Sequence, residues 1–444
     1  MDSLIPKIIE TNWSRRTMGS LVMPEGSPWC DGKPMLWFTG HCYPEFRFCE
    51  NDDGEFDLKL PNPPLPGIDR HGCTSFDVNK DGLVDLICTR GGGQGTATEN
   101  DNQVHLTQED GSLQQIFNHG LESPTRRSYD FIAFKSATGD DLVFEQVFSN
   151  DRKDGLLNKN QLYKWVPQQE DGKYFVEIPG PWGDEQIQPH TVKMVDIDGD
   201  GKLDIFIHAK QLDRKDRQNR GRNIIKIYLQ RKNNRFFESN VQISRARYES
   251  VAIADLNGDG QPDVVGYDSR KKLFHILWNT SKDSKLNVLF TRTIKVMKNY
   301  TKKYAAGNHY VGGIAVLDVN GDGLMDIFVS QSLDEIGEYC SFDIRGGYPA
   351  VRKRFGIVKG GKYNDDGLRE ENTFVPPSDE IPDLLFINKG NWRKQPYPQF
   401  HAKELNLNLK GCAGKQMDSF GEKKLAISKS SLSYPGRFYI LDWS

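Results

Sequence analysis

The sequence predicts an all-β protein in which repeated units form a ring, and two observations lead to this prediction. First, one acidic turn recurs along the chain, at "TSFDVNKDGLVDLICT" (74–89), "KMVDIDGDGKLDIFIH" (193–208), "AIADLNGDGQPDVVGY" (252–267) and "AVLDVNGDGLMDIFVS" (315–330). Second, apolar runs of four to six residues, rich in Ile, Val and Phe, flank these turns, and no long stretch keeps a helical period.

The spacing of the turns sets the size of the unit. Their first aspartates lie at positions 77, 196, 255 and 318, so the gaps are 119, 59 and 63 residues. Because the first gap is twice the others, we expect a degenerate unit near 135, in "DFIAFKSATGDDLVFEQVFS" (130–149). Lys135 replaces the first aspartate there, so this copy is expected to bind no metal. The same period predicts units near 27, at "GSPWCDGKPMLWFTG" (26–40), and near 375, at "PPSDEIPDLLFINKG" (376–390).

Each unit of about sixty residues accommodates four short strands. Since such a unit cannot bury a face alone, seven of them are expected to stack radially into a seven-bladed β-propeller with four-stranded blades. The units, centred near 27, 77, 135, 196, 255, 318 and 375, would form a single domain over residues 1–444. The tail, 400–444, is left over and is expected to close the ring by adding a C-terminal strand, within "GRFYILDWS" (436–444), to the first unit.

The acidic turns predict calcium sites. Ca²⁺ takes six to eight oxygen ligands, and a tight loop of the form Asp-x-Asp/Asn-x-Asp-Gly-x-x-Asp supplies carboxylates at alternate positions and a backbone carbonyl at the seventh. An EF-hand is excluded because position twelve is Cys88, Ile207, Gly266 or Val329 instead of Glu. Without a cation the carboxylates would repel one another, so we expect about four mainly structural Ca²⁺ ions. The predicted ligands are Asp77, Asn79, Asp81, Leu83 and Asp85; Asp196, Asp198, Asp200, Lys202 and Asp204; Asp255, Asn257, Asp259, Gln261 and Asp263; and Asp318, Asn320, Asp322, Leu324 and Asp326.

Composition narrows the partners and the location. A net charge of −3 argues against general nucleic-acid binding, and no apolar run is long enough to span a membrane. Five of the seven cysteines lie in the first ninety residues, which allows one or two disulfides there. No signal peptide is visible, yet calcium loops favour a secreted or luminal protein because resting cytosol holds little free Ca²⁺; a cytoplasmic location stays open. Sequons at Asn12, Asn279 and Asn299 are compatible with secretion.

The four loops, at this period, resemble the FG-GAP/VCBS repeats of the integrin α-chain β-propeller and of secreted and fungal lectin propellers. The resemblance covers about residues 26–444, although the Phe-Gly and Gly-Ala-Pro signatures of the integrin repeats are not clear, so the VCBS-type label fits better. It implies that each calcium hairpin joins the innermost strand of a blade to the next. Segments 71–77, 190–196, 249–255 and 312–318 would then be innermost strands, beginning about 20 Å from the metals.

That arrangement would bring several polar residues to the opposite mouth of the central channel. His71, His190 and Glu249 each precede a first aspartate by six residues, and the degenerate unit offers Tyr129 at this place. Arg126, Arg127 and His309 lie close by in sequence and are candidate ligand-binding residues. Solvated side chains at a wet channel mouth are the plain alternative. Trp29, Trp37, Trp165, Trp182, Trp278 and Trp392 are candidates for stacking on sugars or for packing between blades.

Two function classes follow. The leading hypothesis is a binding module that recognises carbohydrate or protein at the channel mouth or between blades. The alternative is an enzyme, a lyase, cyclase or isomerase that works by acid/base chemistry with His71, His190, Glu249 and Tyr129 as catalytic residues. The fold alone does not decide between them.

Overall fold

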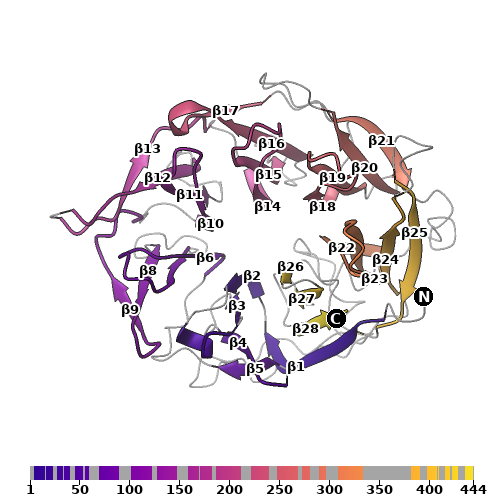
Figure 1. The fold of residues 1–444 in the computed structure, drawn as a ribbon, viewed down its shortest axis with the longest axis horizontal. Coiled ribbons are helices and arrows are strands. Elements are labelled where there is room, and N and C mark those ends of the chain that lie inside the picture. Colours follow the sequence, from indigo (N-terminus) through magenta and orange to yellow (C-terminus); the bar gives the residue numbers. More distant parts are fainter. Residues whose placement is uncertain are drawn as a thin grey trace, which may run out of the picture.

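Seven antiparallel sheets of four strands each form a ring in the computed structural model, and one edge strand of each sheet lies nearest the centre (Figure 1). The structure describes residues 5–15, 17–23, 28–33, 35–40, 46–53, 56–59, 70–89, 102–122, 128–147, 159–169, 171–182, 187–211, 222–239, 248–268, 273–280, 290–296, 309–333, 382–390, 398–407, 409, 416–420, 423–428 and 436–443. Among these residues the regular elements are strands, apart from short 3-10 turns at Pro28–Cys30 and Lys232–Asn234.

The first four blades follow one another along the chain. Blade 1 contains β2 (Thr17–Met23), β3 (Met35–Gly40), β4 (Phe46–Glu50) and β5 (Phe56–Lys59). Blade 2 contains β6 (Cys73–Phe76), β7 (Asp85–Cys88), β8 (Gln103–Thr107) and β9 (Leu113–Ile116). Blade 3 contains β10 (Ser128–Lys135), β11 (Asp141–Val147), β12 (Gln161–Trp165) and β13 (Phe175–Ile178). Blade 4 contains β14 (Ile187–Val195), β15 (Asp204–Gln211), β16 (Arg222–Gln230) and β17 (Phe236–Glu238).

The last three blades include the one that joins the two ends of the chain. Blade 5 contains β18 (Tyr248–Ala254), β19 (Asp263–Asp268), β20 (Leu273–Asn279) and β21 (Phe290–Val296). Blade 6 contains β22 (His309–Leu317), β23 (Asp326–Leu333), β24 (Asp383–Asn388) and β25 (Phe400–Leu405). Blade 7 contains β26 (Gln416–Phe420), β27 (Lys424–Ser428), β28 (Gly436–Asp442) and, as its outermost strand, β1 (Lys7–Arg15).

Two details of the predicted unit boundaries are corrected. The segment around Asp383, assigned to a unit near 375, supplies the third strand of blade 6, because β24 pairs with β23 on one side and with β25 on the other. The tail does close the ring, but as a blade of its own. Its strand β28 pairs with β1 from the N-terminal end of the chain instead of completing the first unit.

The hydrophobic core consists of layers between neighbouring blades. Between blades 3 and 4, for example, Phe144 and Ile207 are fully buried in one cluster with Tyr228. Trp182 packs its ring 5.1 Å from Phe144 and 5.0 Å from Tyr228. Second and third strands are covered on both faces, which explains why β19 and β24 are buried at every residue and read as continuous apolar runs. This packing holds the hairpins between first and second strands in equivalent positions around the ring.

Candidate metal loops and channel residues

The four acidic loops lie in the hairpins that join the first and second strands of blades 2, 4, 5 and 6, at 77–85, 196–204, 255–263 and 318–326. In each loop the carboxylate of the first aspartate accepts the backbone N–H of the sixth residue, a glycine, at 2.7 to 3.1 Å. That glycine has φ of +80 to +91°, a conformation that favours glycine over any other residue. The invariant spacing of aspartate and glycine therefore closes a tight turn.

The third and fifth positions complete the acidic side of each loop. The carboxylate of the fifth residue accepts the N–H of the seventh at 2.8 to 3.0 Å in all four copies. In three copies the third residue is an asparagine whose Nδ2 donates to the other oxygen of that carboxylate, at 2.7 to 2.9 Å. Blade 4 has Asp198 at this position and forms a different contact, described below.

The ninth aspartate lies beneath the loop and ties it to the rest of the blade. Asp85, Asp204, Asp263 and Asp326 are all fully buried. One oxygen accepts the N–H of the second loop residue, and the other accepts a backbone N–H of the third strand, at Thr107, Gln230, Asn279 and Asn388. Burial raises the pKa of Asp263 to about 8 and of the other three to about 7, and the neighbouring carboxylates of the loop act in the same direction.

The second loop residue links neighbouring blades. Its apolar side chain is buried, as Val78, Ile197, Leu256 and Val319 show. Its carbonyl accepts a side-chain N–H from the third strand of the following blade in three copies: Trp165 Nε1 to Val78 at 2.9 Å, Asn279 Nδ2 to Ile197 at 2.7 Å and Asn388 Nδ2 to Leu256 at 2.9 Å. Each of these loops is therefore fixed both to its own blade and to the next one.

The residues of these loops fit a hard divalent cation. In blade 4, one carboxylate oxygen from each of Asp196, Asp198 and Asp204 lies within 4.8 Å of the others. Asp198 Oδ1 is buried and has no hydrogen-bond partner, and the same holds for Asp77 Oδ1 in blade 2. A buried carboxylate oxygen without a donor is costly, and a calcium ion coordinated by such oxygens would remove that cost. Coordination by the carbonyls of Leu83, Lys202, Gln261 and Leu324 stays a prediction.

In the degenerate hairpin of blade 3, lysine side chains pair with the aspartates. Lys135 Nζ lies 3.1 Å from one carboxylate oxygen of Asp141, and Lys80, from the loop of blade 2, lies 3.0 Å from the other. Lys164 Nζ lies 2.7 Å from Asp140. Together these ion pairs lower the pKa of both aspartates. Lysine ammonium groups thus neutralise the acidic residues of this hairpin.

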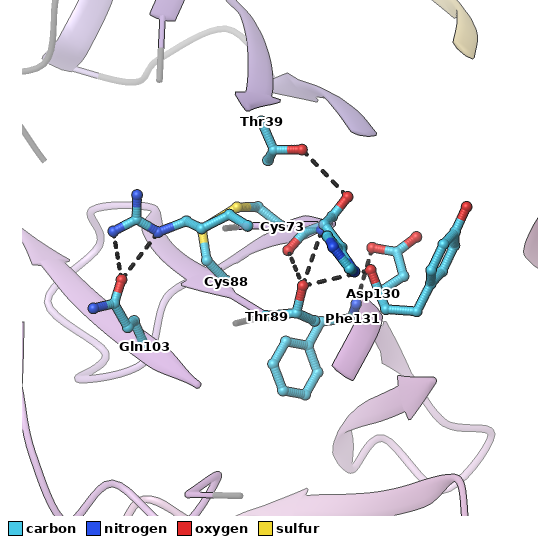
Figure 2. Close-up of a disulfide and its surroundings, with 11 residues drawn as sticks. Thr39, Cys73, Cys88, Thr89, Gln103, Asp130 and Phe131 are labelled. Carbon is cyan, nitrogen blue, oxygen red and sulfur yellow. Dashed lines mark hydrogen bonds between the residues drawn. A yellow bond between two sulfur atoms is a disulfide. The ribbon is translucent and has the colours of Figure 1, made fainter. Parts of the chain in front are cut away.

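His71 and Tyr129 lie side by side at the junction of blades 2 and 3. Their ring centroids are 6.1 Å apart, and His71 is only 2% exposed. The backbone around His71 is fixed, because Thr39 donates to its carbonyl at 3.2 Å and Gly72 exchanges two hydrogen bonds with Thr89 Oγ1 (Figure 2). Burial, followed by the charge of Asp130, raises the pKa of the Tyr129 hydroxyl. These environments are those of packed residues more than of an open proton-transfer site.

His190 lies in a different setting on blade 4. His190 is exposed, and its ring centroid lies 5.2 Å from that of His208 with the planes tilted by 36°. His208 Nε2 lies 3.0 Å from the carbonyl of Tyr248. The Tyr248 hydroxyl in turn lies 3.2 Å from His275 Nδ1, so the series continues into blade 5. Burial lowers the pKa of His208 to about 4 and keeps that ring neutral. The sequence predicts neither His208 nor Tyr248 as a site residue, although His208 follows Asp204 by four residues and Tyr248 directly precedes Glu249.

The shared channel-mouth site stays a prediction. Arg126 and Arg127 lie outside the described residues, and the side chains of Glu249 and His309 are not described, although both residues belong to innermost strands as expected. Most of the described tryptophans pack between or within blades: Trp29, Trp37 and Trp278 are buried, and Trp182 is surrounded by Phe144, Tyr228 and Phe236. Trp392 lies outside the described residues.

Two disulfides lie in the N-terminal third of the chain, as the clustering of cysteines allows. Cys73 and Cys88 are directly opposite each other on β6 and β7 (Figure 2), and Cys30 is joined to Cys49. Of the three sequons, the one at Asn279 has a buried side chain whose Nδ2 is hydrogen-bonded, so it is no accessible glycan acceptor in the folded protein. Within the described residues, no helix has the length and apolar character to cross a bilayer.

Comparisons with known proteins support the fold. No family model and no curated protein matches the sequence. Among solved structures, BBS1N in complex with ARL6DN, soaked with lead, is similar with a TM-score of 0.50 at 10% identity, over 100% of this chain and 98% of that chain. The Dos1 propeller is similar with a TM-score of 0.41 at 10% identity, over 99% and 94%. At this identity the first likeness concerns the fold alone, and with the seven four-stranded sheets it confirms the predicted β-propeller.

Proposed function

We propose that this chain is a calcium-stabilised propeller of the FG-GAP/VCBS type that serves as a protein-binding module. The observation that carries the calcium part is the buried, unpartnered carboxylate oxygen of Asp198 beside Asp196 and Asp204, within a loop geometry that three other blades share. Calcium, when bound, supplies the positive charge that lets these carboxylates lie close together. The chain's own residues shape the site through the turn glycine and the buried ninth aspartate.

Melting the chelator-treated protein with and without added calcium tests this proposal. A cation that binds only the folded state adds about 2.7 kcal/mol per site at a hundredfold excess over its Kd, so the Tm is expected to rise by several degrees or more. Asp318→Ala removes the residue that organises the blade-6 loop and should reduce the calcium response. Asp57→Ala, at an exposed position on β5, should leave the response unchanged. Equal melting curves in calcium and chelator would refute calcium binding.

A protein is favoured over a carbohydrate as the ligand. Sugar sites present exposed aromatic faces, whereas the tryptophans whose side chains the structure describes are buried or partly buried by packing. Phe117 is 73% exposed after β9, and Phe237 is 40% exposed on β17, so single aromatic side chains are exposed at the outer strands of blades 2 and 4. The similar solved structure of BBS1N was determined in complex with ARL6DN, which supports a protein as the kind of partner.

A glycan array and a proximity-labelling experiment separate these two ligand classes. We expect no glycan to be bound by the calcium-loaded chain. Proximity labelling with the full chain should mark a protein, and the labelling should fall at least tenfold for the double variant Phe117→Asp, Phe237→Asp while the Tm is unchanged. A specific glycan bound in calcium would overturn the preference for protein.

We also propose that the protein is secreted or resides in an oxidising lumen. Structural disulfides persist in such compartments, and two are formed between cysteines of the N-terminal third. Calcium sites of extracellular grade fill only where free Ca²⁺ is abundant. Peptide mapping of the unreduced native protein is expected to recover Cys30 linked to Cys49 and Cys73 linked to Cys88, and free thiols at all four positions would argue for a reducing compartment.

A further inference from the structure

The loop of blade 4 departs from the other three at its third position. In blades 2, 5 and 6 this residue is an asparagine, whose Nδ2 donates to the fifth-position carboxylate and fixes its orientation. In blade 4 it is Asp198, which has no N–H to donate when ionised and which adds a carboxylate next to Asp200. Left alone, this pair would repel, and Asp200 Oδ2 would lack the asparagine donor that holds the equivalent oxygen in the other three loops.

Arg231 takes the place of the missing amide. It follows directly after the third strand, β16, and its guanidinium reaches back to the loop of its own blade. Nη2 donates to Asp198 Oδ2 at 2.8 Å, and Nη1 donates to Asp200 Oδ2 at 3.2 Å. The forked guanidinium thus bridges two carboxylates, a geometry that a lysine cannot reproduce. Since the side chain of Asp198 is 1% exposed and that of Arg231 19%, the contact is largely shielded from solvent.

A second cation, Lys202, adds to this effect from the seventh position of the blade-4 loop. Lys202 Nζ lies 2.6 Å from Asp200 Oδ2, whereas the seventh residue is Leu83, Gln261 or Leu324 elsewhere. Arg231 directly follows Gln230, the residue of the third strand that donates to the ninth aspartate. The residues at the equivalent place in blades 2, 5 and 6 are Gln108, Thr280 and Lys389. Lys389 is exposed. Four carboxylates in blade 4 are therefore offset by two cations, while loop 255–263 in blade 5 holds three carboxylates and no basic residue. Loop 318–326 in blade 6 also has no basic residue of its own, but Lys423 from blade 7 lies close to its Gly321.

We propose that Arg231 is a built-in counter-cation that holds the blade-4 loop in its folded shape without calcium, so that this blade depends on the ion less than blade 5 does. The part that concerns calcium rests on the proposed function. Guanidinium beside the site also opposes a second positive charge, so the blade-4 loop is expected to bind calcium more weakly than its counterparts. The molecule would then keep one ordered loop when calcium is scarce.

A double-mutant cycle between Arg231 and Asp198, measured in chelator, tests the proposal. Arg231→Met leaves Asp198 and Asp200 facing each other and should lower the Tm by about 3 °C or more. Asp198→Asn restores the asparagine of the other loops, so in this background Arg231→Met should cost no more than about a third as much. Arg231→Lys keeps the positive charge but not the forked guanidinium, so its Tm should lie between those of the wild type and Arg231→Met. This variant tests the proposal even if Arg231→Met does not fold. Arg235→Met removes an exposed arginine four residues away and is the matched control.

Adding calcium to the same variants gives the second readout. The rise in Tm on adding calcium should be larger for Arg231→Met than for the wild type, because the ion then replaces the lost guanidinium, and Arg235→Met should match the wild type. An equal loss from Arg231→Met in both backgrounds in chelator would overturn the proposal. If no variant responds to calcium, the proposed calcium binding fails, while the cycle in chelator still decides whether Arg231 holds the loop.

Discussion

Asp263 illustrates how one buried carboxylate joins three parts of a blade. Its two oxygens accept the N–H of Leu256 at 3.2 Å and of Asn279 at 2.8 Å, so the loop and the third strand converge on a single side chain. In the ionised form of Asp263, both oxygens act as acceptors at once. Asparagine has the same shape but turns one acceptor into a donor, and a donor would then face a backbone N–H.

Asp263→Asn is therefore expected to lower the free energy of unfolding by about 1–3 kcal/mol, the usual cost of a buried hydrogen-bonding group left without its partner. Urea unfolding measures this loss. Asp57→Asn, at an exposed position of β5, makes the same chemical change and should stay within about 0.5 kcal/mol of the wild type. Equal stabilities of the two variants would show that the Asp263 carboxylate does not hold the loop.

His105 predicts a loss of stability in acid. The ring is 1% exposed, and burial, then the charges of Arg70 and His119, lower its pKa to about 3. The unfolded chain protonates this histidine near pH 6.5, whereas the folded chain resists protonation until about pH 3. The unfolded state therefore binds more protons between these values, and the stability contributed by a neutral His105 is lost as the pH falls through this window.

His105→Gln removes the titrating group, so the difference in unfolding free energy between wild type and variant isolates its contribution from that of the carboxylates. As the pH falls from 6 to 4, the wild type should lose about 1 kcal/mol of unfolding free energy per pH unit relative to His105→Gln. Denaturant unfolding at a series of pH values provides the measurement. A difference that stays constant over this range would mean that the folded protein accommodates the protonated ring.

At the scale of elements, hydrogen bonds from one blade to the loop of the next make the ring cooperative. Asn279 lies at the end of β20 in blade 5, is 2% exposed and donates to the Ile197 carbonyl in the blade-4 loop. Asn279→Ala leaves that carbonyl without its donor and should reduce the free energy of unfolding by about 1–3 kcal/mol. In the presence of calcium, the backbone amides of residues 197–201 should also exchange their hydrogens faster in Asn279→Ala than in the wild type, which hydrogen-exchange mass spectrometry measures.

Trp165→Phe is a conservative version of the same test. It removes the Nε1 donor to Val78 and keeps most of the aromatic packing, so a smaller loss of about 1 kcal/mol is expected. If neither substitution changes the exchange of the preceding blade's loop, these hydrogen bonds do not couple the blades.

Local patterns in the sequence predicted the acidic hairpins because each is specified by its own residues. The first aspartate, the turn glycine and the ninth aspartate act within nine residues, so Asp318, Gly323 and Asp326 could be recognised without knowing the fold. The blade-to-blade donors could not, since Asn388 lies 132 residues from Leu256 in the chain. Arg231 could not be recognised for the same reason, because it lies 33 residues from Asp198 in the chain and reaches the blade-4 loop only when β16 pairs with β15.

The period failed where the chain inserts residues between two strands of one blade. β23 ends at Leu333 and β24 begins at Asp383, so blade 6 is much longer than the others. A count of sixty residues from Asp318 therefore arrives within the same blade, where Asp383 resembles the ninth aspartate of a new loop. The true last blade has a hairpin of only 421–423 between β26 and β27 and no acidic signature to mark it.

At the scale of the whole molecule, the ring is closed by strands from both ends of the chain. β1 is the outermost strand of blade 7 and pairs with β28 through Lys7 to Glu10 and again through Ser14 and Arg15. The inner three strands of that blade come from the last thirty residues. Because blades 6 and 7 share a core layer that contains Phe328, Tyr439 and Leu441, damage to blade 7 would spread to its neighbour.

Removing residues 1–16 should therefore destabilise the entire ring instead of fraying one edge. The deletion leaves β28 with an open edge, and since an incomplete propeller cannot protect that edge, we expect a fall in Tm of about 10 °C or more together with aggregation at micromolar concentration. Deleting only residues 1–4, which precede β1, is the matched control and should leave melting unchanged. Differential scanning calorimetry and size-exclusion chromatography of both variants provide the measurement. A shortened chain that melts in a single transition at the wild-type temperature would show that blade 7 is stable with three strands, and that ring closure depends on β26 to β28 alone.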